Sequence, residues 1–374
     1  MPVVAAPGCR WWPRPGCRWW LRPGCARTPV VARVGGERRP PRYPGGVSDP
    51  TLATRAGADP ARPDPLTPPD VDAVAAALEE HGYIADEGLA TSIFLALVLH
   101  RPLLLEGEAG VGKTEVAKVL SAWTGGDLLR LQCYEGIDVS QAVYEWDYAR
   151  QLLHLRASEV AGERAASNGR PDGAAAAEPT DAVYSERFLV RRPLLQAIDH
   201  GDGPPPVLLI DEVDRADDEF EAFLLEILSE YAVTVPELGT FHAAVPPRVI
   251  ITSNRTRDVH DALKRRCLYH WVPHPDFERE VAIVRLRAPQ AAPVLARQVA
   301  AAVEALRGMQ LYKPPGVAET IDWATALAAL GRATIDERTL DVTLGTVLKY
   351  QEDQNRVRAA GIGELVRAAV LRGA

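Results

Sequence analysis

The stretch Gly107-Glu108-Ala109-Gly110-Val111-Gly112-Lys113-Thr114 restricts the architecture of this chain more than any other part of its sequence. Its glycines allow backbone N–H groups to turn inward around a phosphate, and a following helix directs its positive end at the same place. Lys113 is then expected to reach the β- and γ-phosphates of ATP, and the Thr114 hydroxyl to bind Mg²⁺. The pattern predicts a phosphate-binding loop in preference to a glycine-rich turn.

The segments around this loop alternate between strand and helix patterns. Short apolar runs predict buried strands at Leu103–Leu105, Leu128–Cys133, Val207–Ile210 and Val249–Thr252. Helical patterns occur at Val71–His81 with Asp70 as N-cap, at Glu87–Leu99 and at Glu115–Trp123. Such alternation is typical of a parallel sheet with helices on both faces, so we predict an α/β P-loop NTPase core with three layers.

Two acidic residues, Asp211 and Glu212, follow the apolar strand Val207–Ile210. Asp211 is expected to bind Mg²⁺, directly or through water, and Glu212 to polarise an attacking water as general base. An acidic strand end in an ordinary loop is the alternative. Beside a phosphate-binding loop, the catalytic interpretation is favoured.

Polar residues also follow the strand Val249–Thr252. The amide of Asn254 is suited either to hold the lytic water against the γ-phosphate or to satisfy local backbone groups. The pair Arg265 and Arg266 is suited either to act across a subunit boundary, where such a residue is worth roughly 10³–10⁵ in rate, or to form a solvated basic face. The residues alone leave both choices open.

Composition divides the chain near residue 70. The first 70 residues contain 15 of the 31 prolines, with 11 Arg and 5 acidic residues for a net charge of +6, whereas the remainder has 31 basic and 45 acidic residues for a net charge of −14. We predict a disordered Pro/Arg-rich tail at 1–69, or translated sequence upstream of the native start. A nucleotide-binding core at 70–275 with a low-complexity insertion at 157–182 and a helical domain at 276–374 are expected to follow.

Cysteine usage and hydropathy indicate the compartment. Cys9, Cys17 and Cys25 belong to a Pro-Gly-Cys repeat, which leaves two cysteines in the rest of the chain and no disulfide framework. The apolar run from Ile93 to Leu99 is far shorter than the ~20 residues of a spanning helix. No secretory signal is visible, so we expect a cytoplasmic protein without membrane insertion.

From about Val71 to Ala374, the order of these motifs resembles AAA+ ATPases of the MoxR family, and most closely the CoxD-type subgroup linked to carbon monoxide dehydrogenase maturation. The family likeness depends on the phosphate-binding loop, on Leu208–Ala216, Leu224–Glu230, Ile250–Asp258 and Ala262–Trp271, and on Lys313–Thr320. The likeness to the subgroup depends chiefly on Tyr144–Trp146, Lys264–Trp271 and Lys313–Trp323.

The resemblance implies a homo-oligomeric ring, usually hexameric, that hydrolyses ATP at its subunit interfaces to remodel or mature a metalloenzyme. Asn254 matches the sensor-1 position, and Arg266 is the best match for the finger that acts in trans, with Arg265 second. Tyr83 and Ile84 lie where such proteins cover the adenine. The implied partners are a von Willebrand factor A domain protein and a molybdenum-containing dehydrogenase.

The chain departs from the family pattern in the C-terminal lid. Many MoxR proteins carry an arginine, the sensor-2 residue, just after the glycine that opens a lid helix. Here the segment reads Gly316-Val317-Ala318-Glu319-Thr320, with Thr320 at the position of the arginine. Coupling between lid and γ-phosphate is therefore expected to be weak or to use another residue.

Other function classes remain as alternatives. A small-molecule P-loop kinase shares the phosphate-binding loop, but it does not need the pair Asp211 and Glu212 together with Asn254 and the arginine pair. The charge of −14 argues against a broad polyanion-binding surface, so a nucleic-acid-dependent ATPase is disfavoured and no nucleic-acid partner is expected. A nucleotide-gated scaffold with little hydrolysis is compatible with the missing sensor-2 arginine.

Overall fold

The computed structural model describes residues 68–167 and 183–373. The predicted tail up to residue 67 and residues 168–182 of the predicted insertion lie outside the described residues. The first part of that insertion, residues 157–167, is helical and belongs to α5 (Tyr148–Ser167).

Within the described residues, the central element is a five-stranded parallel sheet with the order β2-β5-β8-β1-β9. The strands are β1 (Leu103–Glu106), β2 (Leu128–Gln132), β5 (Val207–Asp211), β8 (Arg248–Ser253) and β9 (Leu268–Trp271). The first four were predicted. β9 was not, because it is a short, half-exposed edge strand that follows a basic helix.

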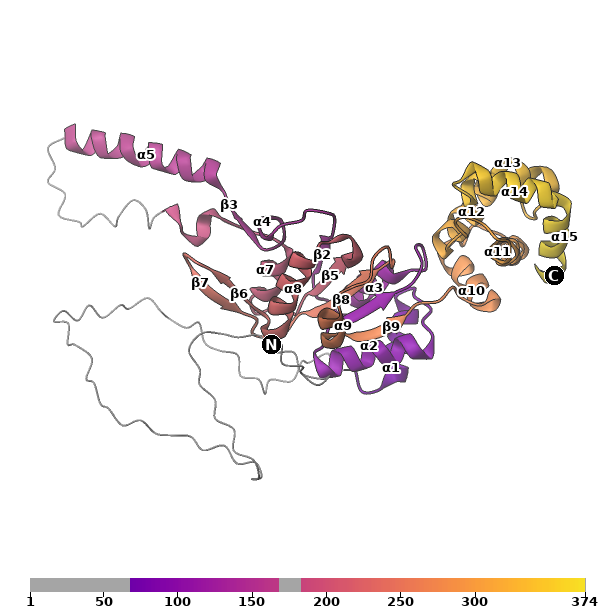
Figure 1. Cartoon of the computed structure of the whole chain (residues 1–374), viewed down its shortest axis with the longest axis horizontal. Coiled ribbons are helices and arrows are strands. Elements are labelled where there is room, and N and C mark those ends of the chain that lie inside the picture. Colours follow the sequence, from indigo (N-terminus) through magenta and orange to yellow (C-terminus); the bar gives the residue numbers. More distant parts are fainter. Residues whose placement is uncertain (1–67, 168–182, 374) are drawn as a thin grey trace, which may run out of the picture. The chain divides into compact units, whose positions relative to one another are not determined.

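Apolar clusters cover both faces of the sheet. Successive side chains of a strand point to opposite faces, so neighbouring residues of one strand belong to different clusters. Leu103 and Leu105 pack in one apolar cluster, and Leu104 packs in another. Figure 1 shows α1 (Val71–Glu80) and α2 (Glu87–Leu99) next to β9, and these helices and α3 (Lys113–Thr124) supply the first cluster. The second cluster is supplied by α7 (Pro193–Ile198), α8 (Asp218–Glu230) and α9 (Asp261–Arg266). The predicted three-layer α/β fold is confirmed.

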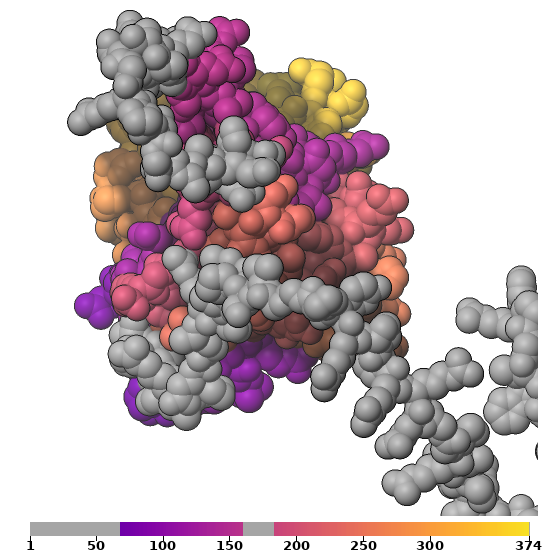
Figure 2. Space-filling view, turned by 90° about the vertical axis from the view of Figure 1, so that its left-hand side faces the viewer, coloured from indigo at the N-terminus to yellow at the C-terminus, as the bar shows by residue number. Residues whose placement is uncertain are grey.

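Two small antiparallel hairpins extend from the core. β6 (Ala232–Val235) pairs with β7 (Gly239–His242). β3 (Tyr144–Trp146) pairs with β4 (Leu189–Arg191) beside α4 (Val139–Ala142). Trp146 is buried, and its ring packs edge-on against Tyr184. Figure 2 shows α5 (magenta) at the surface, and its first turns expose Tyr148, Leu152 and Leu153.

The C-terminal region is entirely helical in its described residues and is called the lid below. Its helices are α10 (Phe277–Arg287), α11 (Pro293–Gly308), α12 (Val317–Ala329), α13 (Glu337–Val347), α14 (Gln351–Ala360) and α15 (Ile362–Gly373). They enclose an apolar cluster of their own. Trp323 is fully buried there and donates a hydrogen bond to Thr343 Oγ1 at 2.9 Å, so it packs the lid.

No helix among the described residues is long and apolar enough to cross a membrane.

Candidate functional site

The loop from Gly107 to Gly112 connects β1 to α3, as the sequence predicted. Gly110 and Gly112 have φ angles of 81° and 98°, which residues other than glycine rarely adopt. This backbone brings the N-terminus of α3 to the carboxyl edge of the sheet. The positive end of the helix and its free N–H groups then form a site for an anion.

The side chain of Lys113 is buried in this loop. Its Nζ donates hydrogen bonds to the carbonyl oxygens of Gly107 at 2.8 Å and Glu108 at 2.7 Å. Burial lowers the pKa of Lys113 to about 8, although nearby carboxylates, including Asp214 and Asp211, oppose this shift. The ammonium group is therefore less stable here than in water, and a bound polyphosphate would restore its charged form.

This lowered pKa predicts that ATP affinity depends on pH. Below about pH 8 the ammonium is already charged, so binding takes up few protons. Above pH 8 it is mostly neutral, and ATP must bind together with a proton, which weakens binding by up to about tenfold per pH unit. Titration calorimetry in two buffers of different ionisation enthalpy should give uptake of about one proton at pH 9 and almost none at pH 6.5. Binding at pH 9 without proton uptake would contradict the assignment.

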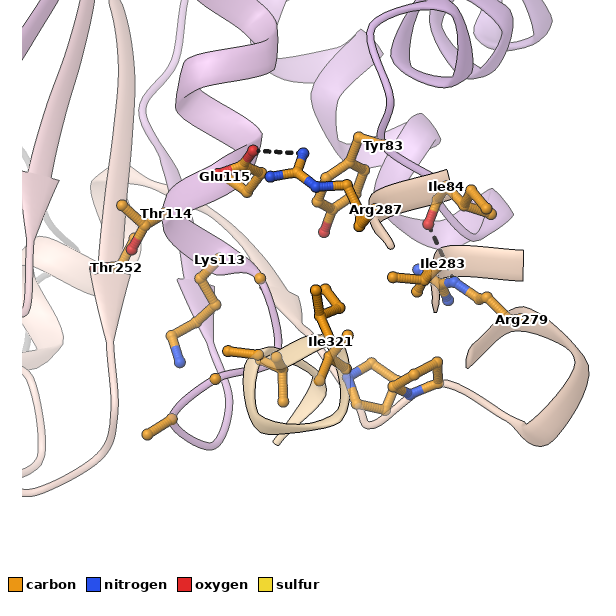
Figure 3. A pocket seen from close by; sticks show the side chains of 18 of the residues that line it. Tyr83, Ile84, Lys113, Thr114, Glu115, Thr252, Arg279, Ile283, Arg287 and Ile321 are labelled. Carbon is orange, nitrogen blue, oxygen red and sulfur yellow. Dashed lines mark hydrogen bonds and ion pairs between the residues drawn. The ribbon is translucent and has the colours of Figure 1, made fainter. Parts of the chain in front are cut away.

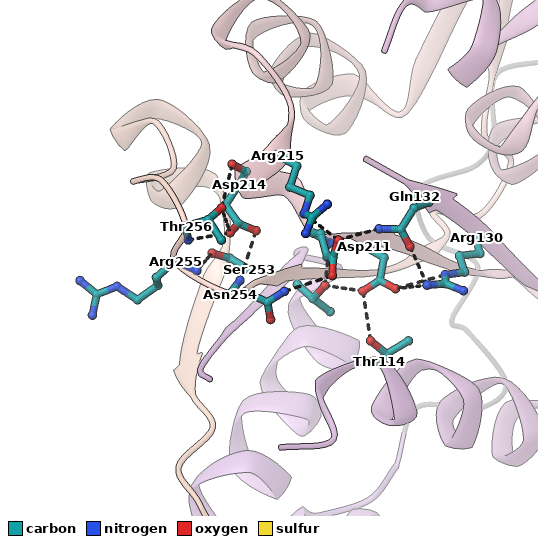
Figure 4. A network of polar contacts seen from close by, with 12 residues as sticks. Thr114, Arg130, Gln132, Asp211, Asp214, Arg215, Ser253, Asn254, Arg255 and Thr256 are labelled. Atoms are coloured by element: carbon teal, nitrogen blue, oxygen red, sulfur yellow. Dashed lines mark hydrogen bonds and ion pairs between the residues drawn. The ribbon is translucent and has the colours of Figure 1, made fainter. Parts of the chain in front are cut away.

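Asp211 and Thr114 lie together, as expected for a shared metal site (Figure 4). The Thr114 hydroxyl donates to Asp211 Oδ1 at 3.1 Å, and the Thr252 hydroxyl donates to the same oxygen at 2.6 Å. A hydroxyl and a carboxylate are hard oxygen donors that suit Mg²⁺, which keeps several waters and completes its shell with substrate phosphates. The residues fit the metal. Mg²⁺ would neutralise charge on the phosphates, and Thr114 and Asp211 would hold it.

Arg130, in the middle of β2, also contacts Asp211, which we did not predict. Its Nη2 and Nε atoms lie 2.6 Å and 3.1 Å from Asp211 Oδ2, so both carboxylate oxygens of Asp211 are hydrogen-bonded. The parallel register pairs Gln132 with Asp211 across β2 and β5. Arg130 and Gln132 alternate with Leu129 and Leu131, which indicates a polar face of β2, but this pattern does not name Asp211 as a partner.

Glu212 is held by partners from three other segments. Its Oε1 accepts from Asn254 Nδ2 at 3.2 Å, and its Oε2 accepts from Gln132 Nε2 at 3.1 Å and lies 3.0 Å from Arg215 Nε. Its backbone N–H donates to Thr252 Oγ1 at 2.9 Å. The carboxylate is thus oriented, while its side chain stays about one third exposed and open to water.

The loop that carries Asn254 is fixed by a second carboxylate. Buried Asp214 accepts hydrogen bonds from Asn254 N at 3.2 Å and from Thr256 N at 2.8 Å. Because Asp214 accepts these backbone N–H groups, the side-chain amide of Asn254 is not needed for them, and it donates to Glu212. Of the two interpretations of Asn254, the geometry favours a role in the site.

These residues surround one cavity of about 360 Å³. One end is polar and contains Lys113, Thr114, Asp211, Glu212 and Asn254, with Gly110, Val111 and Gly112 of the loop. Figure 3 shows Tyr83, Ile84 and Ile283 at the other, largely apolar end, and the cavity is also lined by Ile321, Pro273, Pro275 and Val317. A phosphate end joined to an apolar end matches the chemistry of a nucleotide.

Tyr83 and Ile84 lie at the apolar end, where the resemblance implies the adenine. Tyr83 is buried, which raises the pKa of its hydroxyl well above the usual value. Figure 3 shows the hydroxyl directed into the cavity. The phenol therefore stays protonated and can donate a hydrogen bond there.

Arg265 and Arg266 do not line this cavity. Both are exposed at the C-terminal end of α9, where their carbonyl oxygens accept hydrogen bonds from Arg101 at 2.7 Å and 3.1 Å. Exposure of both guanidinium groups is what an action on a neighbouring subunit requires.

In the described part of the chain, Cys267, His270 and His274 belong to no group of three or more His, Cys, Asp or Glu side chains that could hold a metal ion. His274 Nε2 lies 3.1 Å from Glu108 Oε2, and His270 Nε2 lies 3.7 Å from Asp86 Oδ1. Cys267 is buried, which raises its pKa to about 12.

Comparison with known proteins supports this interpretation of the geometry. Residues 102–267 match the family model described as an AAA domain of the dynein-related subfamily. The core has an AAA+ P-loop NTPase fold. The matched segment contains the phosphate-binding loop, Asp211, Glu212, Asn254 and the arginine pair.

Among solved structures, a point mutant of RuvB from Thermotoga maritima has a TM-score of 0.40 and 13% sequence identity, over 68% of this chain and 67% of that chain. A search of curated proteins returned no match.

Proposed function

We propose that this chain hydrolyses ATP with Mg²⁺ in an oligomeric ring. The observation that carries the proposal is the convergence of Lys113, Thr114, Asp211, Glu212 and Asn254 on one end of a single cavity. AAA+ proteins share these residue types at these positions, and the order of the strands accounts for their meeting here. Release of phosphate from ATP in the presence of Mg²⁺ is the direct test.

The residues divide the chemistry between them. Lys113 and the N-terminus of α3 bind the phosphates, which places the γ-phosphate near the end of β5. Glu212 takes the proton of the attacking water, and Asn254, 3.2 Å from the Glu212 carboxylate, orients that water. Their contact supports the assignment, because one water can hydrogen-bond to both groups at the polar end of the cavity.

Arg266, or Arg265 in second place, completes the site of a neighbouring subunit in this proposal. An arginine near the γ-phosphate stabilises charge in the transition state and is worth roughly 10³–10⁵ in rate. No arginine of the core lines the cavity described above, which supports supply from outside the subunit.

Mixing two inactive variants tests this arrangement. Arg266→Ala should lose hydrolysis by about 10³-fold or more. Adding a Lys113→Ala variant, which keeps its own Arg266, should restore part of the activity because mixed rings pair an intact finger with an intact phosphate loop. Phosphate release across a series of mixing ratios measures the rescue, with Arg265→Ala as the matched variant. Mixed rings no more active than Arg266→Ala alone would refute the trans role.

The substrate of the ring is inferred from the resemblance to the CoxD-type subgroup. We propose a metalloenzyme client and a von Willebrand factor A domain protein as partner. The net charge of −14 outside the tail disfavours nucleic acid as the client. A molybdenum-containing dehydrogenase of the carbon monoxide dehydrogenase type is the client that this resemblance favours. A ring, usually hexameric, in the cytoplasm is part of the same proposal.

A further inference from the structure

One face of lid helix α10 borders the nucleotide cavity. Arg279, Ile283 and Arg287 line the cavity and are spaced four residues apart, so they form one stripe along the helix. Arg285, between the last two, is exposed and does not line the cavity. α10 therefore presents two cations to a cavity that would hold a polyanion.

The two arginines of this stripe are bound differently. Arg279 donates to Ile84 O at 3.1 Å and to Asp86 Oδ2 at 3.0 Å, and its side chain is only 19% exposed. Arg279 is thus fixed as part of the wall. Arg287 is 42% exposed and pairs with Glu115 Oε1 at 2.9 Å. An exposed ion pair of this kind contributes at most about 1 kcal/mol, so Arg287 can exchange Glu115 for a ligand.

The position of Glu115 locates Arg287 along the cavity. Glu115 follows Lys113 and Thr114 in the first turn of α3, and Figure 3 shows Arg287 between Glu115 and Tyr83. A nucleotide with its β-phosphate in the loop and its base at the apolar end passes this point with its ribose and α-phosphate. Arg287 therefore lies beside the middle of the ligand, away from the γ-phosphate.

Lid helix α12 touches the phosphate-binding loop but supplies no cation to the cavity. Ala318 N donates to Gly110 O at 3.2 Å, and a Cβ added to Gly316 would lie 2.8 Å from Ala109 O. Thr320, at the sensor-2 position, is fully buried, and its hydroxyl donates to Glu280 Oε1 at 2.7 Å. Thr320 thus faces the interior of the lid, and only α10 provides lid cations among the described residues that line the cavity.

We propose that Arg287 binds the ribose and α-phosphate portion of the nucleotide and provides the charged contact between lid and ligand. This inference rests on the proposed function. ATP and ADP share this portion, so Arg287 contributes equally to the binding of both. The lid then responds to an occupied site, and γ-phosphate recognition is left to the core and to the neighbouring subunit.

The test compares Arg287→Ala with Arg285→Ala, the same substitution two residues away on the outer face of α10. In calorimetric titrations with Mg-ATP and with Mg-ADP, Arg287→Ala should bind both nucleotides more weakly than the wild type, by about tenfold or more. Arg285→Ala should bind both as the wild type does. Equal binding by the wild type and Arg287→Ala would overturn the proposal, and so would weaker binding of ATP alone, because that result indicates a γ-phosphate contact.

A Glu115→Gln variant separates ligand binding from a structural ion pair. It removes the charge that competes for Arg287, so the proposal predicts nucleotide binding at least as tight as in the wild type. If the ion pair only holds the lid against α3, Glu115→Gln should weaken binding as Arg287→Ala does, and the proposal fails. A wild-type protein that binds neither nucleotide would contradict the proposed function itself, a result distinct from these.

Discussion

The Glu212→Gln variant is expected to hydrolyse ATP about 10²–10⁴-fold more slowly than the wild type while it still binds ATP. Glutamine keeps the size of the side chain and can still contact Asn254 and Gln132, which hold Glu212 at 3.2 Å and 3.1 Å. It cannot take a proton from water. Phosphate release and calorimetric ATP binding, measured on the same preparation, separate these two effects.

Glu226→Gln is the matched control for this variant. Glu226 is exposed on α8 and does not line the cavity, so its neutralisation should leave both measurements unchanged. Hydrolysis by Glu212→Gln at the wild-type rate would remove Glu212 from the role of general base.

Lys113→Ala should weaken ATP binding by about 10²-fold, and hydrolysis should be lost with it. Lys113 is 5% exposed, and its ammonium group would make charge-assisted hydrogen bonds with two phosphates. Folding should survive the change, because burial already destabilises the charged form of this lysine, as its pKa of about 8 indicates. Calorimetric binding and a thermal melt measure the two properties.

Lys118→Ala provides the comparison, since Lys118 is on the same helix, is 56% exposed and pairs only with Glu115 among the described contacts. It should bind ATP within about twofold of the wild type, as expected for a surface ion pair. Undiminished ATP binding by Lys113→Ala would mean that the loop does not bind the phosphates.

The local pattern of the sequence was sufficient for most of the core. The apolar runs at Leu103–Leu105 and Val207–Ile210 are buried on both faces, and glycines with positive φ follow the first of them, so strand, loop and helix were all predictable. The all-helical lid was also predicted correctly from its periodicity. The helix at 157–167 was not, because its alanine-rich composition resembles a low-complexity insertion.

Contacts between distant segments were the part that a single sequence did not reveal. Arg287 and Glu115 are 172 residues apart in the chain, and nothing in either local pattern points to the other. Arg130 is similar, since its partner Asp211 becomes apparent only when β2 is placed beside β5. Asn254 was found by its position at a strand end, but only its contact with Glu212 separates a role in the site from local backbone bonding.

The most direct test of the account is to incubate the purified wild-type protein with ATP and to measure ADP, free phosphate and any phosphorylated product. The convergence of Lys113, Asp211 and Glu212 on one cavity predicts equal amounts of ADP and free phosphate, formed only with Mg²⁺ and over many turnovers. ATP binding without phosphate release, or transfer of the phosphate to a small molecule, would contradict it.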